Sequence, residues 1–182
     1  MDTPGTRNVA AATAGDVAAR WFEAGYNCAE AAVLALLPDS ERAASLLRAA
    51  TGFGGGIARH GLTCGAISGA ALAVGSLLGR TDAQDEAGKE RAYRVIDSVL
   101  RRFEERYGTV QCHRLTGFDF IGPHDEQEFL TKVKPMVCVP LLRFAVEVTV
   151  EELQKAESEP AEAPPGAADT PPGKAPVPPK AA

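Results

Sequence analysis

The sequence lacks every short-range cysteine motif. Its four cysteines are far apart and no Cys-x-x-Cys pair occurs, which excludes a zinc knuckle and a thioredoxin-type motif. No Cys-x-x-Cys-His segment is present either, so covalent c-type haem is not expected. No glycine run ends in Gly-Lys-Ser or Gly-Lys-Thr, and a phosphate-binding loop is therefore not indicated.

Positive charge is also scarce. The 182 residues include 19 Lys and Arg against 24 Asp and Glu, a formal net charge of −5. Such a chain is expected to bind neither nucleic acid nor a lipid surface through a basic patch. Residues 1–15 contain no basic segment followed by an apolar segment, so no secretory signal peptide is expected. Four cysteines without such a signal are expected as thiols, metal ligands or transient redox pairs in the reducing cytoplasm.

One uncharged stretch, residues 62–79, approaches the length of a membrane span. It consists mainly of Gly, Ala and Ser, whose transfer into lipid gains little free energy. Small residues let helices approach each other closely. The stretch therefore favours a buried helix of a soluble bundle over a membrane span.

The spacing of apolar residues predicts an all-α fold, a compact bundle of about six to seven helices. Asn27 with Glu30 three residues later matches a capping box, and Gly108 follows a long amphipathic segment. The stretch 144–150 is rich in β-branched residues, but no partner strand is evident. The predicted helices span 9–24, 28–37, 40–51, 64–78, 85–107, 126–134 and 138–155, with Asp39 or Ser40 and Asp125 as candidate caps and a short turn at 112.

The two ends of the chain differ from the middle. Residues 1–8 are polar and are expected to be flexible, whereas residues 9–156 form the predicted helical domain. Residues 157–182 are rich in Pro, Ala and Glu, and this composition cannot bury enough apolar surface to offset the entropy of ordering. We expect a disordered tail there, with docking to a partner as the alternative.

Each cysteine falls at or near the start of a predicted helix. A helix N-terminus offers free backbone N–H groups and partial positive charge, which stabilise a thiolate and lower the pKa of the thiol. Four such positions indicate helix ends that converge on one site, whereas a single cysteine in an apolar helix is usually a small buried hydrophobic residue. The predicted site consists of Cys28 after the cap Asn27, Cys64 after the cap Thr63, Cys112 after the break at Gly108, and Cys138 before Pro140.

Glycines surround the second cysteine, Cys64. Glycine permits close backbone approach and a positive φ, which suits a loop that contacts a bound group. The candidate cofactor-binding residues are therefore Gly54, Gly55, Gly56 and Gly65. A turn followed by tight helix packing is the alternative.

The three histidines are His60, His113 and His124. His60 lies near Cys64 and His113 adjoins Cys112, so either could supply a ligand or tune a thiol. Solvent-facing loop histidines are the equally weighted alternative. His124 receives no role, and no pair of carboxylates stands out as an acid/base couple.

Five segments carry a joint motif: Gly25-Tyr-Asn-Cys-Ala-Glu-Ala31, Phe53-Gly-Gly-Gly-Ile57, Cys64-Gly-Ala-Ile-Ser-Gly-Ala70, Tyr107-Gly-Thr-Val-Gln-Cys112 and the later Cys138. Together they resemble the redox-active protein family labelled C_GCAxxG_C_C, over about residues 15–150. The label has the order Gly-Cys-Ala where this sequence has Cys-Gly-Ala. The resemblance implies a helical fold and a redox role that depends on the four cysteines, and it supplies no substrate.

The cysteine pattern and the resemblance predict a redox-active protein in electron transfer with an unidentified redox partner. Cys28, Cys64, Cys112 and Cys138 are its candidate catalytic residues, as a thiol/disulfide site, and its candidate metal ligands. The candidate cofactor is an iron–sulfur cluster or another thiolate-bound metal. The alternative function is a non-catalytic zinc-binding structural module or an interaction module.

Overall fold

The computed structural model describes residues 11–37, 40–123 and 126–158. Within these ranges the regular structure is helical, apart from one isolated β-bridge between Thr63 and Gln111. The elements are α1 (Ala11–Glu23), α2 (Cys28–Leu36), α3 (Ser40–Ala50), the 3₁₀ turn η1 (Thr51–Phe53), α4 (Gly65–Leu78), α5 (Glu86–Tyr107), α6 (Cys112–Thr116), α7 (Glu126–Glu128), the π-helix η2 (Phe129–Cys138) and α8 (Val139–Ser158).

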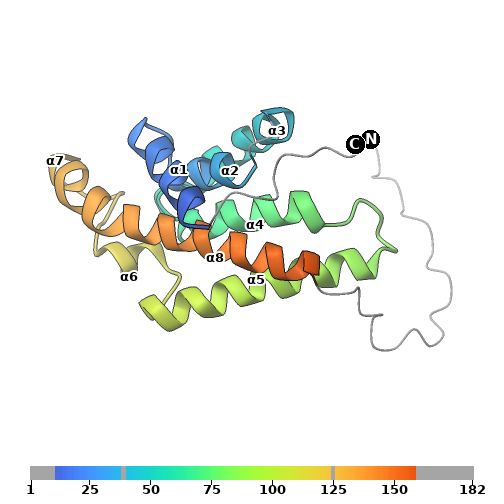
Figure 1. The fold of residues 1–182 in the computed structure, drawn as a ribbon. Coiled ribbons are helices and arrows are strands. Elements are labelled where there is room, and N and C mark those ends of the chain that lie inside the picture. The colour runs from blue at the N-terminus through green and yellow to red at the C-terminus, as the bar shows by residue number, and fades with distance from the viewer. Residues whose placement is uncertain (1–10, 38–39, 124–125, 159–182) are drawn as a thin grey trace, which may run out of the picture.

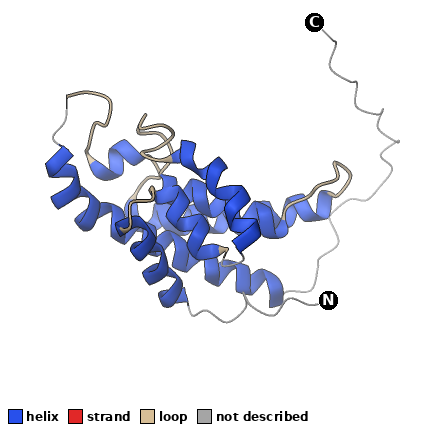
Figure 2. Cartoon of the chain, turned by 90° about the horizontal axis from the view of Figure 1, so that it is seen from above, coloured by secondary structure: helices blue, strands red, loops and turns tan. Residues whose placement is uncertain are grey.

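The all-α prediction is confirmed, and the β-branched stretch 144–150 lies within α8. Figure 2 shows helices and loops but no strand in the described part of the chain. The expectations for residues 1–8, for the caps Asp39 and Asp125, and for residues 159–182 of the tail lie outside the described residues. Residues 157–158 continue α8.

Local capping signals fix several helix ends where the sequence predicts them. The side chain of Asn27 accepts hydrogen bonds from the backbone N–H groups of Ala29 and Glu30. The Glu30 carboxylate accepts the N–H of Asn27 at 2.7 Å, which completes the capping box at the start of α2. Gly108 ends α5 with φ 77°, a left-handed conformation that glycine adopts without steric cost.

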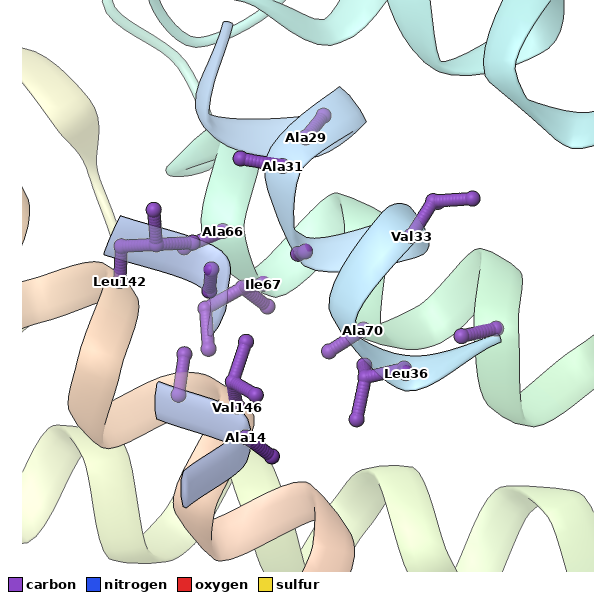
Figure 3. Packing of buried hydrophobic residues seen from close by; sticks show 14 of the residues in the cluster. Ala14, Ala29, Ala31, Val33, Leu36, Ala66, Ile67, Ala70, Leu142 and Val146 are labelled. Carbon is purple, nitrogen blue, oxygen red and sulfur yellow. The ribbon is translucent and has the colours of Figure 1, made fainter. Parts of the chain in front are cut away.

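Helices α2, α4 and α8 form the centre of the bundle. They pack against each other, α1 contacts α2 and α8, and α8 also contacts α4 and α5 (Figure 1). The labelled core side chains in Figure 3 come from α1, α2, α4 and α8. The buried helix predicted in residues 62–79 is therefore confirmed as α4, and none of the described helices has the length and apolar character to cross a membrane.

Small residues allow α2 and α4 to approach closely. A Cβ atom added at Gly69 would lie only 2.4 Å from the carbonyl oxygen of Ala29 and 2.8 Å from the Cβ of Ala32. Neither backbone nor a packed methyl group can move out of such a contact without shifting the helix. The spacing of the two helices therefore depends on the absence of a side chain at Gly69.

Replacing Gly69 with alanine is expected to lower the free energy of unfolding by about 1–3 kcal/mol, because the new methyl group overpacks the contact between α2 and α4. Denaturant unfolding followed by circular dichroism measures the change. Gly75→Ala is the matched control in the same helix, with nothing within 4 Å of an added Cβ. Its higher helix propensity should raise stability by up to about 1 kcal/mol. Equal effects of the two substitutions would contradict the close approach.

Candidate functional site

All four cysteines line one cavity of about 510 Å³. They come from four elements: Cys28 begins α2, Cys64 precedes α4, Cys112 begins α6 and Cys138 ends η2. Each of them is a free thiol. The fold thus brings together cysteines that are widely separated in the sequence, while their chemical role remains a prediction.

An isolated β-bridge places Cys64 beside Cys112. The N–H of Cys64 donates to the carbonyl of Val110 at 2.7 Å, and the N–H of Cys112 donates to the carbonyl of Leu62 at 2.6 Å. Neighbouring residues of an extended segment point to opposite faces. Cys64 directly follows Thr63 and Cys112 directly follows Gln111, so both cysteine side chains point to the face opposite to the two bridged side chains. Thr63 therefore pairs across this bridge and is not the predicted cap of α4, whose N-cap is Cys64 itself.

Backbone amides surround the sulfur of Cys28. Backbone N–H groups of Cys28, Ala29, Gly55 and Gly65 lie near it and favour its thiolate. Two of these amides belong to the first turn of α2, one to the start of α4, and one, that of Gly55, to the glycine-rich loop that follows η1, here called the glycine loop. A Cβ atom added at Gly65 would lie 2.3 Å from this sulfur. Glycine is therefore required at position 65 for the amide to approach the thiol.

The glycine loop adopts a left-handed conformation over five consecutive residues, 55–59. The φ angles are 63° and 71° at Gly55 and Gly56, then 59°, 47° and 71° at Ile57, Ala58 and Arg59. Each non-glycine residue in this conformation costs about 1–2 kcal/mol. Such strain persists only where surrounding contacts impose it, and it is concentrated at functional sites.

Polar contacts tie this loop to the cap of α2. The side-chain amide of Asn27 donates to the Thr51 carbonyl at 3.1 Å, and the Thr51 hydroxyl donates to the Glu30 carboxylate at 2.7 Å. A Cβ atom added at Gly54 would lie 3.0 Å from the Asn27 side chain. The capping box thus positions both Cys28 and the loop that covers it.

Cys138 lies within continuous helical backbone and not at a free helix start. The residues on both sides of the junction between η2 and α8 are right-handed helical, and the N–H of Val139 donates to the carbonyl of Lys134, five residues earlier. Pro135 within η2 has no N–H to donate, which accounts for a shifted hydrogen-bond register here. The predicted start of the last helix is confirmed at Val139, but η2 precedes it, so Cys138 has no free helix N-terminus, whereas Cys28, Cys64 and Cys112 lie at helix starts as predicted.

Aromatic side chains form one wall of the cavity. The rings of Phe118, Phe120 and Phe129 lie 4.8–5.4 Å apart between centroids. Lys134 also lines the cavity, and its Nζ lies 4.6 Å from the centroid of the Phe22 ring. Sequence analysis missed this wall. The three phenylalanines within a short, otherwise polar segment were the available signal.

Burial raises the pKa of all four thiols. Loss of water is the main cause in each case, and it raises the pKa of Cys112 to about 11 and that of Cys138 to about 12. Burial and then the nearby Cys28 thiolate raise the pKa of Cys64. Burial also raises the pKa of Cys28, while its backbone amides oppose the change. The expected lowering by helix ends is therefore wrong in sign, because desolvation outweighs their partial charge.

The remaining predicted site residues are three glycines and three histidines. Gly54 and Gly55 line the cavity, and Gly56 packs against Cys112, with an added Cβ atom 2.7 Å from that of the cysteine. His60 and His113 are exposed and do not line the cavity, and His124 lies outside the described residues. Among the residues that the structure describes, no three His, Cys, Asp or Glu side chains are arranged to hold a metal ion.

The raised pKa of Cys112 predicts a loss of stability at alkaline pH. A thiol whose folded pKa of about 11 exceeds the ordinary value of 9.0 contributes fully to stability below pH 9 and loses that contribution as the pH rises through 11. The free energy of unfolding of the reduced protein should fall by about 1–3 kcal/mol more than that of Cys112→Ser over this range. Denaturant titrations under reductant measure both curves, and parallel curves would contradict the prediction.

Comparison with known protein families gives a match over residues 26–152, a range that contains all four cysteines. The matching family is described as "Putative redox-active protein (C_GCAxxG_C_C)". Comparison with curated proteins and with solved structures gives no match. The resemblance inferred from the sequence is thus confirmed, and the chain belongs to the redox-active C_GCAxxG_C_C family.

Proposed function

We propose that this chain is a thiol-based redox protein that transfers electrons through reversible dithiol–disulfide exchange. The observation that carries the proposal is that Cys28, Cys64, Cys112 and Cys138, all free thiols, line a single cavity. Membership of a family described as redox-active supports a redox role in general. The protein would act in the reducing cytoplasm, where cellular reductants return a disulfide to the dithiol state.

The electrostatics of the cavity support chemistry within a group of thiols. The Cys28 thiolate contributes to the raised pKa of Cys64, Cys112 and Cys138, so the four sulfurs act on one another as charges. Such mutual repulsion favours a state in which few of them are ionised together. Oxidation of two thiols to a disulfide removes two protons and two electrons, after which neither sulfur of that pair can ionise.

A thiolate-bound iron–sulfur cluster or zinc ion is the second candidate. Four cysteines are the ligand number of both, and a bound cation favours the deprotonated thiol despite burial. Hydrogen bonds to ligating sulfurs also tune such sites, and four backbone N–H groups lie near the sulfur of Cys28. The described side chains would have to move into a metal-holding arrangement, and for this reason we place the dithiol function first.

Protein purified without oxygen separates these functions. For the dithiol function we expect iron, zinc and acid-labile sulfide well below stoichiometric amounts, and four titratable thiols in the reduced protein. A mild oxidant should then remove thiols in pairs, and a dithiol reductant should restore them. Each Cys→Ser variant of a participating pair should lose that paired oxidation.

Other outcomes assign the site differently. Iron with sulfide in the purified protein would establish the cluster. One equivalent of zinc, with unfolding on chelation, would establish the structural module. In either case the dithiol proposal fails.

A further inference from the structure

We propose that the cavity receives a small organic disulfide with an aromatic or apolar body and a carboxylate, and that Cys28 is the sulfur that attacks it. This inference rests on the proposed dithiol function, for which it names the substrate class and the attacking residue. Two features carry it: the backbone amides around Cys28 and the composition of the cavity wall.

The surroundings of Cys28 differ from those of the other three thiols. Four backbone N–H groups from three segments of the chain lie near its sulfur and favour its thiolate, and one of these segments, at Gly65, approaches so closely that an added Cβ atom would lie 2.3 Å from the sulfur. At Cys64 one backbone N–H, that of Ala66, has this effect, and at Cys112 the Thr116 side chain. Converging N–H dipoles stabilise negative charge on the atom they surround. Cys28 is therefore the sulfur best placed to carry charge in an attack.

Exposure separates the four cysteines into two pairs. Only 6% of Cys64 and 5% of Cys112 is exposed, whereas Cys28 and Cys138 are of intermediate exposure. Lys134 favours the Cys138 thiolate, while Cys28 and Cys112 disfavour it. Of the two less buried cysteines, Cys28 is thus the one with several backbone N–H groups near its sulfur.

The size and wall of the cavity indicate what enters it. A volume of about 510 Å³ lies within the range of small-molecule sites. Its wall includes the Phe118, Phe120 and Phe129 cluster, and aromatic faces favour stacking with an aromatic or apolar body. A single metal ion would leave most of this space unused.

The charges at the cavity favour a carboxylate on the substrate. Arg59 and Lys134 both line the cavity, and neither forms an ion pair with the described residues. One carboxylate, that of Glu126, also lines it, so the cations outnumber it. An anionic group on the substrate can therefore pair with a cation that forms no ion pair with the described residues.

The chemistry balances in two exchanges. The Cys28 thiolate attacks one sulfur of the substrate R–S–S–R, the substrate S–S bond breaks, and RS⁻ leaves as the mixed disulfide forms. A second cavity cysteine then loses its proton and attacks the Cys28 sulfur, which breaks the mixed disulfide and releases the second RS⁻. Two protein thiols are thereby oxidised to one disulfide, and the substrate disulfide is reduced to two thiols.

The test uses the full, reduced chain and two disulfide probes. Dithiobis(nitrobenzoate) carries aromatic rings and carboxylates, whereas cystamine is aliphatic and cationic. Each rate is divided by the rate of the same probe with free cysteine, because the two leaving thiols differ in pKa. We expect a saturable reaction with the first probe, a much slower and non-saturable reaction with the second, and the first adduct at Cys28 when the probe is limiting. Peptide mass mapping identifies the modified cysteine, and Cys28→Ser should lose the fast phase.

Two lysines of η2 provide matched variants. Lys134→Ala should slow the reaction at low probe concentration by roughly three- to fivefold, as expected for the loss of one partly exposed charge pair. Lys132→Ala removes the same charge from a residue that pairs with Glu128 and does not line the cavity. This variant should react at the wild-type rate.

The outcomes separate the parts of the proposal. A first adduct at another cysteine, mapped on the wild-type chain, would overturn the role of Cys28 even if Cys28→Ser does not fold. Equal rates with both probes relative to free cysteine, or equal rates for the two lysine variants, would overturn the substrate class. The proposed function fails separately, in metal analysis and paired thiol oxidation, because the mapping reports on the reduced chain alone.

Discussion

The close contact between α2 and α4 is the constraint on which the site depends. Gly69 lets the backbone of α4 approach Ala29 in the first turn of α2. The same two helices start at Cys28 and just after Cys64, so their spacing also sets where these thiols lie. Four residues before Gly69, on the same face of α4, Gly65 brings its amide to the sulfur of Cys28. Core packing and site geometry are therefore one constraint, carried by two glycines one helical turn apart.

Burial and backbone polarity act in opposite directions within this site. An apolar cavity keeps thiols neutral, which protects Cys64 and Cys112 from indiscriminate oxidation. Helix starts alone do not overcome that effect, since the pKa of Cys112 rises to about 11 although it begins α6. At Cys28 the glycine loop and α4 add two amides to those of its own helix. The number of N–H groups near each sulfur thus distinguishes the cysteines, whereas the label of helix N-terminus does not.

The sequence predicts what local contacts determine. The capping box at Asn27 and the left-handed end at Gly108 involve residues within one helical turn, and both are visible as spacing. The bridge between Thr63 and Gln111 depends on a partner almost fifty positions away and leaves no local pattern. The shift in hydrogen-bond register around Cys138 could not be predicted, because the helix continues through Pro135, whereas a proline normally marks a helix start or break. The gathering of the cysteines was inferred because the same kind of local signal occurred four times.

The left-handed loop links the separate sulfurs more directly than any helix does. The N–H of Gly55 lies near the sulfur of Cys28, and Gly56 packs against the Cβ of Cys112. Hydrogen bonds close the loop on itself, from Leu62 to the carbonyl of Gly56 at 3.0 Å, directly before the bridge that holds Cys112. Its local conformation is unfavourable at three non-glycine residues, so the bridge and the cap of α2 must impose it. Because no covalent bond joins the thiols, their relative positions depend on this imposed backbone, and a chemical step that draws two sulfurs together must work against the contacts that hold it.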